Sequence, residues 1–276
     1  MRSRILLQEY NPNLIGYGLG TSLAFEEAAQ LNVAEDGAIS RDMPFMAKYL
    51  IRKMRRDPRI DIRKHWKLIY IFIGHNDICT DSCYVPRILD VVENHRTDLI
   101  ETLRILKNNL PRTLVNIIMT ANLKTLSEEA NERRTLECYF LPRVECPCLF
   151  GLPHQHRRAE IYDVLRRFHE VEMEVIRYPE FNSKDFTVVS SPIVSNSYIP
   201  RTCDGRRDLS YFSIDCFHIS QKTNAMFANG LWNNLLEPID NKTDSWGPLF
   251  EKFLCPTPER PFIVTRENSQ MMFGTS

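Results

Sequence analysis

Three apolar segments rich in β-branched residues constrain the fold of this chain more than any other feature of its sequence. They run from Leu68 to Ile73, over "TLVNIIMTANL" from Thr113, and over "FTVVSSPIV" from Phe186. The segments between and after them carry apolar residues at helical spacing, namely Leu99, Leu103, Leu106 and Leu110, then Ile161, Val164, Leu165, Phe168, Val171 and Val175, then Ala225, Ala228, Leu231, Trp232 and Leu235. Continuous apolar strands that alternate with amphipathic helices are typical of a parallel sheet covered on both faces. The sequence therefore predicts a three-layer α/β/α fold, with ligands bound beyond the carboxyl ends of the strands.

The first apolar segment ends in Gly74-His75-Asn76-Asp77, four residues that do not continue a buried strand comfortably. Gly, Asn and Asp are common wherever a strand stops, so a simple turn is one interpretation. A functional site is the other, because the tetrapeptide lies at the carboxyl end of a predicted central strand. Taken alone, these four residues favour neither interpretation.

A second short stretch, "YFSIDCFHISQKTNAM", places Asp215 three residues before His218 and just ahead of a predicted helix. Ser220 is a candidate N-cap for that helix. A carboxylate that hydrogen-bonds an imidazole fixes its tautomer and stabilises the imidazolium, as in hydrolytic triads. A single Asp-x-x-His is more often a capping aspartate beside an exposed histidine, and that alternative stays open at this point.

The eight cysteines, at 79, 83, 138, 146, 148, 203, 216 and 255, lie mostly in loop-like, proline-rich stretches. An even number of cysteines in such places predicts a disulfide framework and an oxidising compartment. Cys79 and Cys83 are a candidate short-range pair, and the other pairings stay open.

"NKT" at Asn241 is a candidate glycosylation acceptor. The apolar stretch at residues 5–7 is too short for a signal peptide, so the cysteines suggest export while the start of the chain shows no signal for it.

The net charge of the chain argues against nucleic acid as a partner. The balance of 35 basic against 35 acidic residues gives no electrostatic footprint for nucleic acid, and no nucleic-acid partner is expected. The basic run "YLIRKMRRDPRIDIRKHW" is interleaved with apolar residues, which favours the solvent face of a helix over a membrane or nucleic-acid patch. No window approaches the roughly eighteen apolar residues that a membrane span requires.

A metal site is a weaker alternative, suggested by "HQH" at His154–His156 and "CPC" at Cys146–Cys148. These spacings fit no common zinc signature, and the two arginines after "HQH" favour the start of a helix. A disulfide role for the cysteines is the stronger interpretation, and no metal or organic cofactor is expected.

Taken together, the two polar motifs resemble those of a known family. "IGHND" matches the Gly-x-Asn-Asp block, and "DCFHIS" the Asp-x-x-His block, of the SGNH (GDSL) esterase/lipase superfamily. The phospholipase B1-like branch is the more similar one, through "EYNPNLIGYGLGT", "HWK", "CPC", "KDFTVV", "LWNNLLEP" and "FLCPTPERPF". The resemblance runs from about residue 8 to about residue 268. It implies a flavodoxin-like SGNH-hydrolase fold with a parallel sheet, and we expect one such domain over residues 1–256 followed by a C-terminal tail over 257–276.

The same resemblance implies roles for four residues. The segment "NVAEDG" looks like the one that carries the oxyanion-hole glycine of the family, so the Gly37 N–H and the Asn76 amide are the expected donors to a developing oxyanion. His218 is the expected general base and Asp215 its orienting partner. His75 occupies a variable place in the Asn block where the branch more often has a smaller residue, and it either narrows the site or points away.

The nucleophile of the family is a serine in a Gly-Asp-Ser-Leu block at the end of the first strand, and this chain contains no Gly-Asp-Ser. Ser22 in "GTSL" is the tempting substitute. We interpret it as a decoy, because "NLIGYGL" is a short, glycine-broken entry and because residues 10–21 resemble a family segment that follows the serine block. The serine strand is therefore expected upstream of Met1, in a chain truncated as a partial gene model, a shorter isoform or a piece of a precursor. A stable pseudoenzyme is the alternative.

The function implied by the resemblance is phospholipase B-like hydrolysis of lipid esters by acyl transfer through a Ser-His-Asp triad, of which this chain shows only His and Asp. A catalytically inactive lipid-binding or interaction module of the same fold is the alternative. The expected partners are a phospholipid or other lipid ester and, peripherally, a membrane surface, with the protein itself a monomer. A full-length product is expected to be secreted, extracellular or membrane-associated.

Overall fold

The computed structural model describes residues 3–128, 135–196, 198–248 and 251–274. Its single sheet contains the strands β1 (Lys67–Ile71), β2 (Thr113–Ile118), β3 (Asn182–Ser183) and β4 (Phe186–Ser191), in the order β1-β2-β4-β3. The long strands pair in parallel, with Ile69 opposite Val115 and Val115 opposite Val188, while β3 is a short antiparallel addition. The predicted parallel sheet is confirmed.

The first strand occupies a different place from the one predicted. Within the described residues β1 is an edge strand, whereas its continuous apolar sequence predicted a central one. Its burial alternates along the strand, while β2 and β4 are buried throughout. The edge of β1 that faces away from β2 pairs with no other strand of the described chain.

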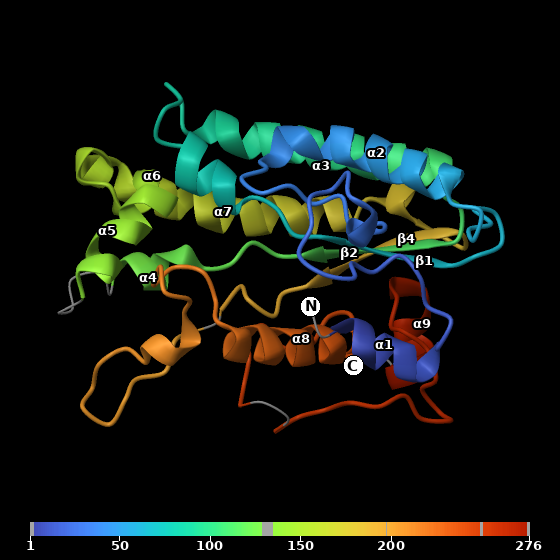
Figure 1. Cartoon of the computed structure of the whole chain (residues 1–276). Coiled ribbons are helices and arrows are strands. Elements are labelled where there is room, and N and C mark those ends of the chain that lie inside the picture. The colour runs from blue at the N-terminus through green and yellow to red at the C-terminus, as the bar shows by residue number, and fades with distance from the viewer. Residues whose placement is uncertain (1–2, 129–134, 197, 249–250, 275–276) are drawn as a thin grey trace.

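Helices cover both faces of the sheet, which gives the expected three layers (Figure 1). One face carries α2 (Met43–Arg56), α3 (Leu89–Asn109) and α7 (Arg158–Ile176). Leu99, Leu103 and Phe168 of these helices are at most 1% exposed, so the helical spacing read from the sequence marks the buried stripes.

The opposite face is covered mainly by α8 (Gln221–Leu236), with α1 (Ser3–Tyr10) and α9 (Arg266–Phe273) beside it (Figure 1). Gly230 lets α8 approach the chain that follows β4, because a Cβ at this position would lie 2.4 Å from Ile193 Cδ1. The segment predicted as a tail, 257–276, contributes contacts to this layer: Val264 N–H donates to the Leu235 carbonyl, and Ser269 Oγ accepts from Ile239 N–H. The domain boundary itself stays a prediction.

Shorter elements gather beyond the carboxyl ends of the strands, at the left of Figure 1. They include α4 (Leu123–Glu128), α5 (Leu136–Glu145), α6 (Pro147–Phe150) and a single π-helical turn, Asp77–Asp81. The 3₁₀ turns of the described chain are Glu27–Ala29, Ser40–Asp42, Leu152–Arg157, Pro179–Phe181 and Leu209–Tyr211.

Three disulfides fasten this end of the molecule, as the cysteine pattern predicted in general terms. The bonds join Cys79 to Cys146, Cys83 to Cys148 and Cys138 to Cys216. The candidate pairing of Cys79 with Cys83 was wrong, because Cys79 bonds to Cys146, the residue before α6, and Cys83 bonds to Cys148 within α6. Cys203 and Cys255 are exposed free thiols. No helix in the described part of the chain is long and apolar enough to cross a membrane.

Candidate functional site

Gly74 lets the chain turn sharply after β1. Its φ is +106°, a conformation that side-chain-bearing residues rarely adopt. A Cβ here would also lie 2.9 Å from the Thr120 hydroxyl oxygen and 3.2 Å from the Phe168 ring. Both the backbone conformation and the close packing therefore require glycine, and the turn directs residues 75–77 to the carboxyl edge of the sheet.

The turn after β1 is bonded to a loop that lies far from it in sequence. Asn76 donates from Nδ2 to the Ala38 carbonyl at 3.0 Å, and the Asp77 carboxylate accepts the Ser40 N–H at 3.0 and 3.1 Å. These bonds place Gly37, next to Ala38, beside the Asn76 turn. The two expected oxyanion donors thus lie on adjoining segments.

Gly37 has the features that an oxyanion donor needs. Its φ is +72°. The Ala38 N–H donates to the Glu35 carbonyl and closes a turn in which Gly37 is the third residue. A type II turn requires glycine at this position. No atom lies within 4 Å of where its Cβ would be, so the space in front of it is open. Its N–H donates to no other group in the described chain, and is therefore available to a ligand.

A buried polar network lies next to the Asn76 turn, and the sequence did not predict it. Ser40 Oγ lies 2.7 Å from His95 Nδ1, and His95 Nε2 lies 3.6 Å from Glu172 Oε1. Glu172 also accepts from the Thr120 hydroxyl at 2.8 Å. Burial raises the pKa of Asp77, although His95 and the Ser40 hydrogen bonds oppose the rise. The members come from separate loops and helices, so no spacing in the sequence indicates them.

His75 is hydrogen-bonded to the chain that follows β2. Its Nε2 accepts the Ala121 N–H at 2.9 Å, just beyond the end of β2, and its ring contacts Phe72 edge-on. Burial lowers the pKa of His75 to about 4, so the ring is neutral at physiological pH and carries its proton on Nδ1. The side chain therefore joins the turn after β1 to the chain that follows β2.

Asp215 and His218 are directly hydrogen-bonded. The distance from His218 Nδ1 to Asp215 Oδ2 is 2.7 Å, and Asp215 Oδ1 accepts the N–H groups of Phe217 and His218 at 3.0 and 2.9 Å. Burial opposes the ionisation of Asp215, but these hydrogen bonds outweigh it and the pKa of the carboxyl is lowered. The carboxylate is thus held ionised and aimed at the ring.

The helix after this pair begins as predicted. Ser220 caps α8, since its hydroxyl accepts the Thr223 N–H at 3.4 Å. With Nδ1 of His218 directed at Asp215, the other ring nitrogen, Nε2, is left to act on a ligand. The side chain of His218 is exposed, so a ligand can approach it from solvent.

Covalent links hold the His218 loop at the same end of the sheet as the Asn76 turn. Cys216 is bonded to Cys138 of α5, and α6, which follows α5, is bonded to Cys79 and Cys83 beyond the turn. Phe217 packs edge-on against Phe150 of α6, with 5.9 Å between ring centroids. No hydrogen bond between described residues joins His218 to Asn76 or Gly37. That these three residues act in one site is a proposal.

Ser22 has no contact that would make it a nucleophile for His218. Its hydroxyl donates to the Gly20 carbonyl at 3.5 Å. Among the described residues it makes no hydrogen bond to the His218 ring, which a serine nucleophile needs.

Three of the residues that suggested metal binding have other partners. Cys146 and Cys148 form disulfides, and the His154 ring packs edge-on against Tyr84. Across the described ranges, no group of three or more His, Cys, Asp or Glu residues could hold a metal ion.

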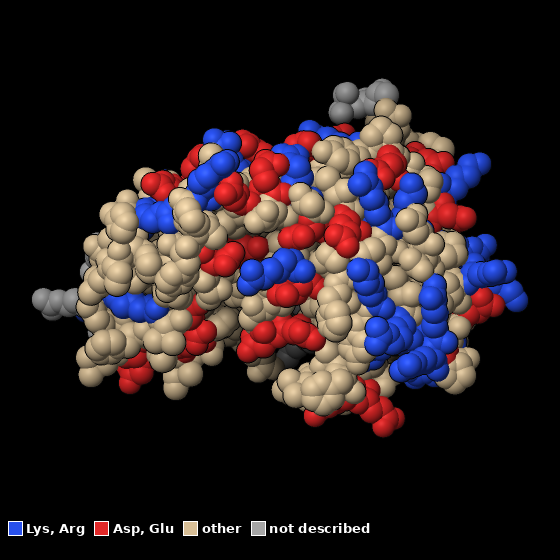
Figure 2. All heavy atoms as spheres, turned by 90° about the horizontal axis from the view of Figure 1, so that it is seen from above, with Lys and Arg blue, Asp and Glu red and all other residues tan. Residues whose placement is uncertain are grey.

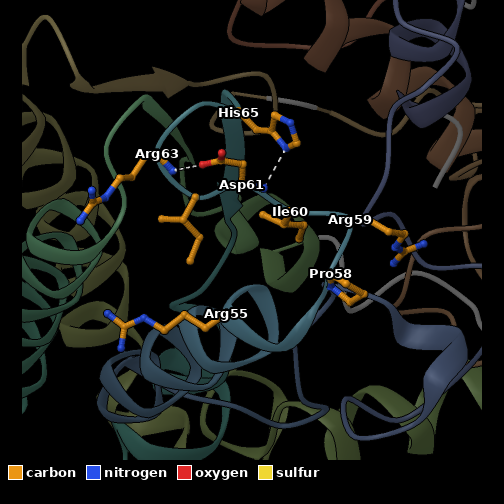
Figure 3. A pocket seen from close by; sticks show the side chains of 8 residues that line it. Arg55, Pro58, Arg59, Ile60, Asp61, Arg63 and His65 are labelled. Carbon is orange, nitrogen blue, oxygen red and sulfur yellow. Dashed lines mark hydrogen bonds between the residues drawn. The ribbon is translucent and has the colours of Figure 1, made fainter.

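A surface hollow lies elsewhere. It is formed by the loop between α2 and β1, at the amino ends of the strands, and it is lined by Arg55, Pro58, Arg59, Ile60, Asp61, Ile62, Arg63 and His65 (Figure 3). The Asp61 carboxylate accepts the Arg63 N–H, and the Asp61 N–H donates to the His65 ring, so the loop is organised by its own contacts. This hollow contains none of the residues predicted for the site.

Comparisons with known proteins give one consistent result. The family model described as "GDSL-like Lipase/Acylhydrolase" matches residues 4–231. "Phospholipase B1, membrane-associated" of Homo sapiens is 33% identical over 280 residues, which is 98% of this chain and 19% of that protein. The proteins of the same name from Rattus norvegicus and Mus musculus are 35% and 34% identical, over 98% of this chain and 19% and 18% of theirs. The chain thus spans about a fifth of the length of these relatives. No solved structure matches it significantly.

Proposed function

The chain belongs to the GDSL-like lipase/acylhydrolase family, and we propose that it provides the base and the oxyanion donors of a phospholipase B-like active site for lipid esters. The observation that carries this proposal is the 2.7 Å hydrogen bond between His218 and an Asp215 carboxylate held by two backbone N–H groups. That geometry is the one a general base of a hydrolytic triad requires.

In the proposed reaction, His218 Nε2 accepts the proton of a serine hydroxyl as the oxygen attacks the acyl carbonyl carbon. Asp215 keeps the Nδ1–H tautomer and stabilises the imidazolium that forms. The imidazolium then gives its proton to the leaving alcohol of the lipid, which leaves an acyl-serine ester. A water molecule, deprotonated by the same ring, hydrolyses that ester and releases the fatty acid.

Gly37 and Asn76 are the proposed oxyanion donors. The Gly37 N–H is unpaired in the described chain, and Asn76 uses one amide hydrogen on Ala38 and keeps a second. Such donors act on charge that develops only in the transition state, and removing one typically costs about 10²–10³ in rate.

The serine is proposed to come from a strand that pairs with the free edge of β1. The sequence contains no Gly-Asp-Ser, and β1 pairs on one side only within the described residues. A parallel neighbour of β1 would end at the same edge of the sheet as the Gly74 turn, where the other site residues are expected to act.

A non-catalytic lipid-binding module is the second candidate. The absence of a Gly-Asp-Ser block from the 276 residues favours it. In this case the same end of the fold would bind lipid without turnover.

Labelling with a fluorophosphonate probe separates the two candidates. The 276-residue chain alone should show no labelling, because it has no Gly-Asp-Ser block and no serine hydroxyl of the described residues is hydrogen-bonded to the His218 ring. A protein extended at its amino terminus by a segment ending in Gly-Asp-Ser-Leu should be labelled and should hydrolyse lipid esters. His218→Ala in that extended protein should abolish both. Stoichiometric labelling of the short chain, or full activity of the His218→Ala variant, would refute the proposed triad.

The proposed setting is extracellular or at a membrane surface, as a monomer. Three disulfides and relatives named as membrane-associated support this setting. Asn241 of the "NKT" sequence is exposed, as a glycosylation acceptor must be.

A further inference from the structure

The helix α5 (Leu136–Glu145) exposes an apolar face to solvent, which is the reverse of an ordinary surface helix. Leu136, Phe140 and Val144 are 75%, 56% and 72% exposed, and Tyr139 beside them is 42% exposed. We call these four residues the α5 apolar face. Single exposed apolar side chains are normal on a protein, but a set of them on one helix indicates an interaction site.

The helical repeat explains how these side chains come to share one face. Residues four apart lie one above the other, which aligns Leu136, Phe140 and Val144. The opposite side of α5 carries its buried residues, Cys138 and Pro142. The helix is therefore anchored by two small groups while its large apolar side chains face outward.

The α5 apolar face is fixed beside the proposed base. The Cys138–Cys216 disulfide, with 5.1 Å between the two Cα atoms, ties the inner side of α5 to the loop that carries His218. Ile214 on the same loop is 84% exposed, so a further apolar side chain stands next to the Asp215–His218 pair. Figure 1 places α5 at the end of the molecule where the strands have their carboxyl ends.

Basic side chains gather at the other end (Figure 2), while α5 itself carries Arg143, whose guanidinium lies over the Tyr139 ring. Figure 2 shows Lys and Arg side chains gathered at the right, over the end of α2 and the loop that follows it, while the left end is mostly uncharged. The exposed basic residues of that segment include Arg52, Arg55, Arg56, Arg59 and Arg63. An anionic surface would therefore attract the end away from the site, whereas the α5 end suits an uncharged or zwitterionic one.

We propose that the α5 apolar face, together with Ile214, inserts into the surface of a zwitterionic lipid layer and so turns the His218 end of the molecule toward its substrate. The choice of lipid as the occupant rests on the proposed function. Helices that lie in a lipid–water interface bury an apolar face of this kind in the boundary between head groups and acyl chains. The proposed site would then receive lipid from the surface on which the protein sits.

Vesicle binding by the 276-residue chain tests this docking without any need for turnover. The chain should co-sediment with phosphatidylcholine vesicles, with little dependence on salt. The double variant Phe140→Ser/Val144→Ser should need at least about tenfold more lipid for half-maximal binding, because two inserted apolar groups are lost. Trp66→Ser is the matched control, since Trp66 is an aromatic residue of similar exposure, 64%, at the amino end of β1. It should bind as the unchanged chain does, and circular dichroism should show all three proteins folded.

Three results would overturn the proposal. The first is no binding to phosphatidylcholine by the folded chain. The second is binding only to phosphatidylserine-containing vesicles, abolished by salt, which would assign docking to the basic end. The third is self-association in analytical ultracentrifugation that the double variant removes, which would make the α5 apolar face a contact between two copies. A failure of ester hydrolysis in the extended protein would refute the proposed function while leaving this binding result intact.

Discussion

At the scale of single residues, both the backbone conformation and the packing of Gly74, near the proposed site, disfavour any side chain at this position. Its φ of +106° disfavours any side chain, and a Cβ would meet Thr120 and Phe168 at 2.9 and 3.2 Å. We expect Gly74→Ala to lower the free energy of unfolding by about 2–5 kcal/mol, since backbone strain costs about 1–2 and overpacking about 1–3. Urea denaturation measures the change.

Gly20→Ala is the matched control for that measurement. Gly20 has no positive φ, and nothing lies within 4 Å of the position of its Cβ. The substitution should leave stability unchanged or raise it by up to about 1 kcal/mol, because alanine reduces the entropy of the unfolded chain. Equal effects of the two substitutions would contradict the packing argument for Gly74.

His75 gives stability a defined pH dependence. Burial lowers its pKa from 6.5 to about 4 in the folded protein, so between these values the unfolded chain binds the proton more readily. Stability should therefore fall as the pH decreases from 6.5 to 4, by about 2 kcal/mol after allowance for the partial exposure of the residue.

Urea denaturation of the unchanged chain and of His75→Gln across this pH range isolates the contribution. Glutamine can still accept the Ala121 N–H but does not titrate, so the variant should lose that part of the acid destabilisation. Parallel pH profiles for the two proteins would show that the His75 ring is not the group responsible.

At the scale of elements, the Cys138–Cys216 bond joins α5 to the loop before α8 across 78 residues of sequence. Removing it with Cys138→Ala/Cys216→Ala should cost about 2–4 kcal/mol of stability, because the unfolded chain regains the freedom of the closed loop. Hydrogen exchange should also become faster at residues 211–220, since that loop loses its anchor.

Cys203→Ser serves as the control for the disulfide variant. Cys203 is an exposed free thiol, and its replacement should change stability by less than about 0.5 kcal/mol. If the double variant were as stable as this control and its loop remained as well protected, the bond would not be what positions the His218 loop.

At the scale of the whole molecule, the two ends of the sheet differ in chemistry. The carboxyl end combines the proposed site, all three disulfides and the α5 apolar face, while the amino end carries the arginine-lined hollow and most of the exposed basic segment. The net charge of zero conceals this separation, since it sums residues over both ends. The proposed orientation on lipid depends on this difference between the ends.

The alternation of apolar strands and amphipathic helices determined the layered fold by itself, because strands covered on both faces are mostly apolar along their whole length. The same reasoning located α3, α7 and α8 and the Ser220 cap, since these depend on residues within a few positions of one another. The spacing of Asp215 and His218 allowed their hydrogen bond, and the resemblance to the SGNH family favoured it over a capping role for the aspartate.

Only the tertiary structure decided the features that join distant segments. Cys79 and Cys83 are close in sequence, yet each bonds to a cysteine at the start of α6, Cys146 just before the helix and Cys148 within it. The contacts of Asn76 with Ala38 and of Ser40 with His95 join segments separated by 38 and 55 residues, so no local sequence pattern predicts them. Likewise, the exposure of the α5 apolar face depends on which side of that helix the Cys138–Cys216 bond holds against the fold, because an apolar stripe in a sequence normally marks the buried side.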